Sequence, residues 1–112
     1  MVSAGMVEMK VIQDGTITEG SGNVFADLGF SPAEARNLHM RSQMMIALRV
    51  YIEKYGLTQA NASKQLKVTQ PRISDLMRGK INRFPLDTLV NMLTDAGLDV
   101  DLRIRVGRKK VV

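Results

Sequence analysis

The chain of 112 residues contains no cysteine, no tryptophan and a single histidine, His39. Without cysteine it can form neither disulfides nor thiolate metal sites, and a single histidine does not make a catalytic or metal centre. Aromatic residues make up only 4% of the chain, which disfavours stacking on single-stranded nucleic acid. No apolar run approaches the length of a membrane span. These absences argue against an enzyme, a bound cofactor and a membrane protein.

The start of the chain, MVSAGMVEMK, lacks the basic and then apolar pattern of a signal peptide, so we expect a cytoplasmic protein. The length predicts one domain with a single core. Residues 1–22 show no helical period and become rich in glycine and small polar residues, so we expect a flexible acidic arm. The predicted domain comprises residues 23–97, followed by a strand at 98–106 and a basic tail at 107–112.

Charge is distributed unevenly along the chain. Residues 1–30 carry a net charge of −3, residues 31–97 a net charge of +5 and residues 98–112 a net charge of +3. Between Lys64 and Arg83 there are six basic side chains and one acidic side chain, Asp75. This concentration favours a polyanionic partner, and a solvated basic face is the alternative.

A long helix is predicted from Pro32 to Tyr55. Ser31 and Glu34 form a capping box around Pro32, and Gly56 favours a left-handed helix end. Inside the helix, apolar residues recur at spacings of three and four, at Met45, Leu48, Ile52 and Tyr55. Because the helix is long for a globular protein, a break near residues 37–40 is an alternative.

Two short helices follow, with about three residues between them. Thr58 caps the first, which runs to about Leu66, and Thr69 caps the second, which runs to about Arg78 before Gly79. The residues expected to pack between the two helices are small or apolar, namely Ser63, Leu66, Val68, Ile73 and Leu76. This pattern describes a helix-turn-helix, whose second helix enters the DNA major groove by its N-terminal residues.

The last predicted helix begins at Pro85 and ends at Gly97, with Leu86, Leu89, Val90 and Leu93 on its buried side. After it, LDVDLRIRV alternates apolar and charged residues from Leu98 to Val106, the pattern of a strand with one solvent-exposed face. The predicted fold is therefore an all-α bundle of four to five helices with a C-terminal β-strand.

The stretch VTQPRISDLMRGK, residues 68–80, has an unusual helix start. Pro71 falls in the first turn, where its missing N–H breaks no intrahelical bond. Arg72 opposes the helix dipole by about 0.3 to 1 kcal/mol, which favours a partner outside the chain. Gln70 can pair with adenine, Arg72 with guanine, and Asp75 either with cytosine or with Arg72. The predicted base contacts are Gln70, Pro71, Arg72, Ser74 and Asp75, of which Ser74 could instead reach a phosphate.

Phosphate contacts are predicted from the basic and polar residues around this helix. The second helix begins at Gln59, where free N–H groups form an anion site, and a further site follows the third helix. The predicted set is Gln59, Lys67, Thr69, Arg78, Lys80, Asn82 and Arg83. For Arg78 the alternative is a favourable position in the last helical turn without any DNA contact.

The segment LTQANASKQLKVTQPRISDLMRGK resembles the helix-turn-helix of the XRE family of phage-repressor-like regulators. The wider stretch from Asn23 to Val106 is similar to the HigA-like antitoxin branch. Asn61, Ser63 and Lys67 depart from the glutamate, alanine and glycine usual in that pattern. If Lys67 must be left-handed, it costs about 1 kcal/mol relative to glycine, so we expect a slightly remodelled turn.

This resemblance implies a phage-repressor-like DNA-binding fold, dimeric operator binding and a RelE-like toxin as partner. We expect a repressor that acts as an antitoxin and engages the toxin through the acidic arm. Two alternatives remain, a stand-alone XRE-type regulator and a protein-interaction module that uses the arm and the strand without DNA contact.

The strand at 98–106 has no evident partner within the chain, so we predict that two copies pair antiparallel about Leu102. Asp99 then faces Arg105 and Asp101 faces Arg103 on both sides of the two-fold axis, while apolar residues meet on the other face. Pairing with MKVIQ in the arm is the alternative.

Overall fold

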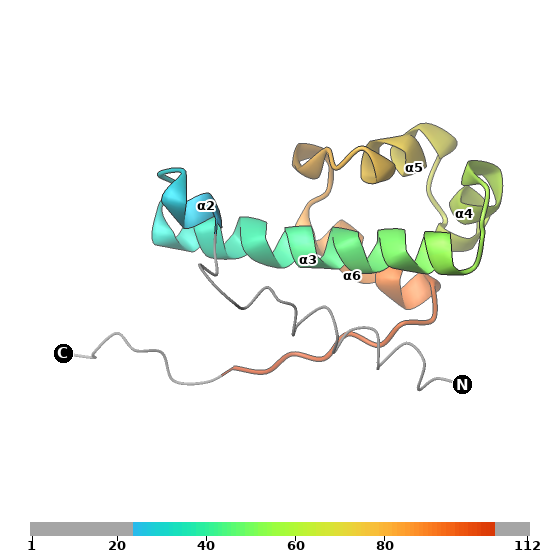
Figure 1. Ribbon diagram of the computed structural model, residues 1–112. Helices are drawn as coiled ribbons and strands as arrows, with labels where there is room; N and C mark the ends of the chain where they lie inside the picture. The colour runs from blue at the N-terminus through green and yellow to red at the C-terminus, as the bar shows by residue number, and fades with distance from the viewer. Residues whose placement is uncertain (1–23, 105–112) are drawn as a thin grey trace.

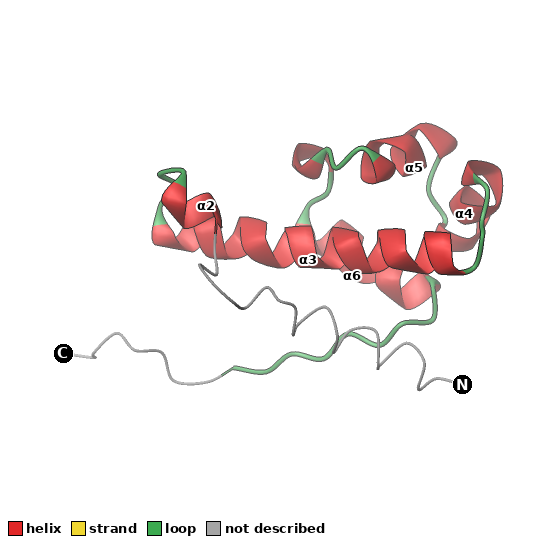
Figure 2. Cartoon of the chain, viewed as in Figure 1, coloured by secondary structure: helices red, strands yellow, loops and turns green. Residues whose placement is uncertain are grey.

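The computed structural model describes residues 24–104. These residues form five α-helices and one 3₁₀-helix, without a β-strand (Figures 1 and 2). In chain order they are α2 (Val24–Asp27), α3 (Pro32–Lys54), α4 (Gln59–Leu66), α5 (Gln70–Met77), η1 (Ile81–Arg83) and α6 (Leu86–Asp95). The predicted all-helical class is confirmed for this part of the chain. The acidic arm at 1–22, the basic tail at 107–112 and the last two residues of the predicted strand lie outside it.

Helix α3 begins with the predicted capping box. The Ser31 hydroxyl accepts a hydrogen bond from the Glu34 N–H at 3.2 Å, and the Ser31 N–H donates to the Glu34 carboxylate at 3.4 Å. The helix then continues without interruption to Lys54, so the alternative with a break near residues 37–40 is wrong. At the far end Gly56 has φ +60°, the left-handed conformation expected of the stop. Figure 1 shows α3 beneath α4 and α5, with α2 against its N-terminal end.

The core lies between the C-terminal part of α3 and helices α4, α5 and α6. Its largest fully buried side chains are Leu48, Leu66, Ile73, Leu76, Phe84, Leu89, Met92 and Leu93. The apolar positions predicted for the helix-turn-helix at Leu66, Ile73 and Leu76 are among them. Because these residues hold α5 by one side, its opposite side faces solvent. No helix among residues 24–104 has the length and apolarity needed to cross a membrane.

The turn between α4 and α5 contains the only non-glycine residue with positive φ in the described chain, Lys67, at φ 58° and ψ 43°. Its N–H donates to the Ser63 carbonyl, and the Val68 N–H donates to the same oxygen at 3.1 Å. The Lys67 ammonium lies 3.7 Å from the Asp95 carboxylate on α6. Lysine therefore adopts the left-handed conformation that glycine usually provides, and the ion pair offsets part of its cost.

After α6 the chain continues as an extended segment. Leu98 is buried in the core, whereas Val100, Leu102 and Ile104 are 38%, 79% and 82% exposed. Residues 98–104 pair with no other described segment, so the predicted strand is not formed within this part of a single copy. Pairing between two copies stays a prediction.

Candidate nucleic-acid interface

Helices α4 and α5 form the predicted helix-turn-helix, and threonine caps both at their N-termini. The Thr58 hydroxyl accepts from the Asn61 N–H at 3.0 Å, and the Thr69 hydroxyl accepts from the Arg72 N–H at 3.3 Å. Pro71 lies in the first turn of α5, as predicted. Capping leaves the start of α5 well formed although it contains proline and arginine.

The predicted base contacts differ in exposure. Gln70 and Pro71 are exposed at the start of α5, and Arg72 and Ser74 are half-buried. Asp75 is only 7% exposed. The first turn of α5 is therefore open to a ligand, whereas the side of the helix that carries Asp75 is closed.

Arg72 has partners inside the chain, which were not expected from the sequence. Its guanidinium donates to the Arg83 carbonyl at 3.2 Å, and its central carbon lies 5.7 Å from the centre of the Phe84 ring. A cation over an aromatic face is stabilised by the ring quadrupole. A first-turn cation at this position therefore does not need a partner outside the chain. The remaining argument for a DNA contact by Arg72 is its position in the first turn of α5, which is open to a ligand.

Asp75 was expected either to accept from cytosine or to pair with Arg72, and the structure places it elsewhere. Its carboxylate lies 3.3 Å from the Arg83 guanidinium and 3.6 Å from that of Arg78. A buried carboxylate paired in this way would have to lose a partner before it reached a base. The arrangement points instead to a structural role, in which Asp75 holds two predicted phosphate-binding arginines.

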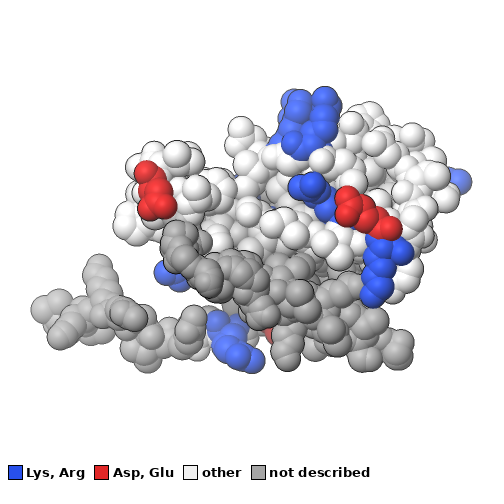
Figure 3. Space-filling model, in the orientation of Figure 1, with Lys and Arg blue, Asp and Glu red and all other residues white. Residues whose placement is uncertain are grey.

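All seven predicted phosphate-binding residues are exposed. Lys67 is engaged by Asp95, and Arg78 and Arg83 by Asp75, while their side chains remain 73%, 60% and 55% exposed. In Figure 3 a group of Lys and Arg side chains lies at the top of the view, where Figure 1 shows α5 and η1, and further basic side chains lie elsewhere on this face. A surface of this kind suits phosphate contacts, which position a duplex without distinguishing bases.

Arg41, which connects α3 to this surface, was not predicted from the sequence. Its Nε donates to the Phe84 carbonyl and its Nη2 to the Ile81 carbonyl, both at 2.8 Å, and its Nη1 donates to the Asn37 side chain at 3.0 Å. The spacing of four from Asn37 was visible in the sequence. The contacts with residues 81 and 84 required the tertiary structure.

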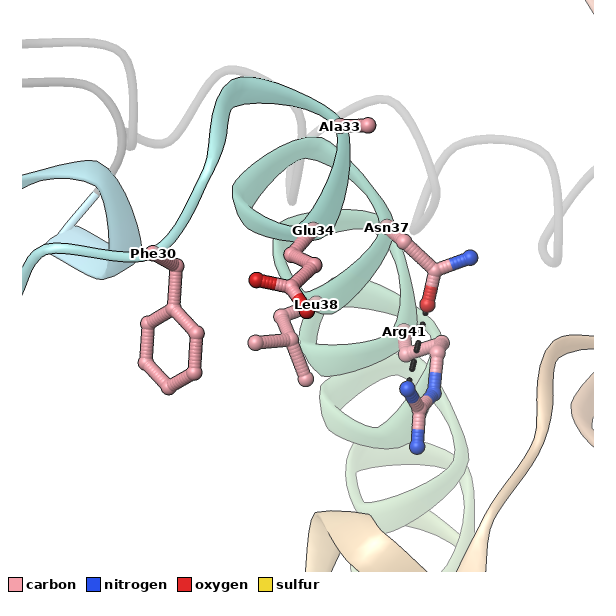
Figure 4. Close-up of a pocket in the computed structure, with 6 residues that line it drawn as sticks. All are labelled: Phe30, Ala33, Glu34, Asn37, Leu38 and Arg41. Carbon is pink, nitrogen blue, oxygen red and sulfur yellow. Dashed lines mark hydrogen bonds between the residues drawn. The ribbon is translucent and has the colours of Figure 1, made fainter.

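A shallow pocket of about 330 Å³ opens beside the N-terminal part of α3, away from the turn of the helix-turn-helix (Figure 4). It is lined by Phe30, Ala33, Glu34, Asn37, Leu38 and Arg41. Nearby, Val24, Leu28 and Phe30 are 54%, 68% and 43% exposed. This region combines exposed apolar side chains with the guanidinium of Arg41, which also bonds to the Ile81 and Phe84 carbonyls.

The family model described as a helix-turn-helix domain matches residues 24–105. The chain belongs to the helix-turn-helix domain family. This helix-turn-helix protein is also similar to a solved structure described as a putative XRE-family transcriptional regulator, with 26% identity, a TM-score of 0.63, and coverage of 70% of this chain and 89% of the other. No curated protein matches it. The helix-turn-helix protein is thus a DNA-binding transcriptional regulator, which is not an enzyme, and its fold is similar to that of this XRE-family structure.

Proposed function

We propose that the protein is a transcriptional repressor that binds its own promoter as a homodimer and acts as the antitoxin of a toxin–antitoxin pair. The observation that carries the DNA part is the open first turn of α5 beside exposed basic side chains of η1 and its flanks. In helix-turn-helix proteins this end of the second helix enters the major groove.

In the proposed complex, Gln70 and Arg72 contact base edges, with Pro71 and Ser74 beside them. Arg72 leaves Phe84 and the Arg83 carbonyl to reach guanine, so part of its binding energy offsets the loss of those interactions. The phosphate contacts are the seven exposed residues predicted from the sequence. Asp75 is left out of the base contacts, because it is buried and holds Arg78 and Arg83.

The proposed dimer pairs the C-terminal segments of two copies about Leu102. Val100, Leu102 and Ile104 form an exposed apolar strip, and Asp99 and Asp101 of one copy face Arg105 and Arg103 of the other. Two helix-turn-helix units then bind half-sites about 34 Å apart, one helical turn of DNA. Reversing the charges of Arg103 and Arg105 should break the dimer in sedimentation experiments, and reversing Asp99 and Asp101 as well should restore it.

The antitoxin part of the proposal is supported by the likeness to HigA-like sequences and by the acidic residues 1–22, opposite in charge to an RNA-cleaving toxin. It is tested by co-purification with the product of the neighbouring reading frame. An arm-deleted chain should bind DNA but not a RelE-like toxin. Retention of the toxin by the deleted chain at undiminished affinity would exclude the arm as its binding site, and absence of any toxin-like neighbour would favour a stand-alone regulator.

The DNA contacts are tested by titrating promoter DNA and random DNA in gel shifts. Arg72→Ala should weaken promoter binding by about 1 to 3 kcal/mol and relax the preference at one base pair. Lys80→Ala should weaken both DNAs alike and reduce the salt dependence. If Arg72→Ala bound both DNAs as the wild type does, the assignment of base contacts would be wrong.

A further inference from the structure

The segment between α5 and α6 contains three of the proposed phosphate contacts, Lys80, Asn82 and Arg83. Its only regular structure is η1, a 3₁₀-helix of three residues. Such short 3₁₀ segments have poor hydrogen-bond geometry and are weakly stable alone. Lys80 at the N-cap provides no side-chain cap. Something else in the fold must therefore hold this segment in one conformation.

Arg72 and Asp75 of α5 contact Arg83, and the side chain of Arg41 adds support from α3. One guanidinium donates to the carbonyls of Ile81 and Phe84, the first residue of η1 and the residue directly after it, at 2.8 Å each. Phe84 itself is fully buried, which fixes one end of the segment in the core. Arg41 thus joins both ends of η1 to the longest helix of the described chain.

The orientation of the guanidinium is fixed as well. Asn37, one turn earlier in α3, accepts from the third nitrogen of Arg41 at 3.0 Å. A planar guanidinium can make these bonds simultaneously in fixed directions, whereas a lysine ammonium offers a single nitrogen on a flexible stem. The interaction therefore depends on arginine geometry in addition to positive charge.

We propose that Arg41 is a positioning residue for DNA binding, which holds η1 so that Lys80, Asn82 and Arg83 meet the phosphates of one strand together. This inference depends on the phosphate contacts of the proposed function. Arg41 does not itself contact DNA. Its removal would let η1 move, and phosphate binding would then have to order the segment first, which lowers affinity for every DNA sequence alike.

The experiment measures binding of promoter and random DNA by the full chain over a range of salt concentrations, for Arg41→Gln, Arg41→Lys and the wild type. Arg36→Gln is the matched control, because Arg36 is an exposed arginine of the same helix. We expect both Arg41 variants to bind both DNAs about tenfold more weakly, with an unchanged preference for the promoter. The slope of log K against log salt should fall by about 0.9 for each phosphate that the variant no longer neutralises.

Thermal unfolding and amide exchange of Arg83 and Phe84 accompany these measurements, so that local loosening of η1 is distinguished from general unfolding. If the folded Arg41→Gln protein kept the wild-type affinity and salt slope, the positioning role would be refuted. Wild-type behaviour of Arg41→Lys alone would refute it too, since charge would then suffice.

Lys80→Ala and Arg83→Ala separate this inference from the proposed function. If they reduce the salt slope and the Arg41 variants do not, only the positioning role fails. If neither alters the slope, η1 does not bind phosphate, and both the phosphate assignment and the role of Arg41 are overturned.

Discussion

Residues 24–40 and residues 41–98 are stabilised in different ways. In the second region, α4, α5, α6 and the end of α3 share a core in which eight large side chains are fully buried. In the first, Ala35 is the only buried residue, and α2 is held by local contacts such as the edge-to-face pair of Phe25 with Phe30 in the turn before α3, whose ring centroids lie 6.1 Å apart. The DNA-binding region is therefore complete in one chain, whereas the α2 end leaves apolar surface uncovered.

The largest effect should come from removing a core side chain. Phe84→Ala removes a fully buried ring and should destabilise the protein by about 3 to 5 kcal/mol. Leu28→Ala, at a residue that is 68% exposed, should change stability by less than about 0.5 kcal/mol. Urea unfolding measures both. Equal losses of stability would show that the α2 end is buried by another surface, such as a second copy, under the conditions of the experiment.

Within residues 41–98, a substitution with a smaller effect on stability should affect DNA binding more than folding. Arg72→Ala removes a half-exposed hydrogen bond and a cation–π interaction, so it should lower the unfolding free energy by only about 0.5 to 1 kcal/mol. Promoter binding should weaken by more, about 1 to 3 kcal/mol. Urea unfolding and DNA titration of the same preparation test this. A larger decrease in stability than in binding would identify Arg72 as a structural residue.

Ser31→Ala examines the other region. The capping box provides two hydrogen bonds at the start of α3, and its removal costs about 1 kcal/mol locally. Because few core side chains depend on this turn, we expect amides near residue 34 to exchange about fivefold faster while global stability changes little. The control is Thr69→Ala, which removes a cap next to the core. If both variants shifted global unfolding equally, the two regions would fold as one unit.

The smallest effect concerns the left-handed Lys67. Lys67→Gly relieves a backbone cost of about 1 kcal/mol but removes the ion pair with Asp95, so a net gain of about 0.5 kcal/mol is expected. Lys67→Ala removes the ion pair and keeps the backbone cost, so it should be slightly destabilising. Thermal unfolding compares the three proteins. A glycine variant less stable than the alanine variant would show that the turn is not strained.

The sequence predicted those parts of the fold that depend on local chemistry. Ser31, Thr58 and Thr69 cap helices, and Gly56 ends α3, because caps and left-handed stops involve only neighbouring residues. It did not predict η1 or α2, which are too short to show a period. The sequence also did not predict that Asp75 is buried or that Arg72 has partners within the chain. Both depend on the folded position of residues 83 and 84, which follow α5 and pack against it. Exposure at the start of α5 followed from the apolar spacing, but the hydrogen bonds of Arg41 could not be found without the folded chain.

Arg41 belongs to two sites, since it lines the pocket at the N-terminal part of α3 and also bonds to the Ile81 and Phe84 carbonyls at the two ends of η1. A molecule that entered this pocket and drew the guanidinium away from the Ile81 and Phe84 carbonyls would weaken DNA binding. Thermodynamic linkage then requires the reverse, since bound DNA would weaken that molecule's affinity by the same factor. Through this single side chain, occupancy of the pocket and occupancy of the operator would then be coupled.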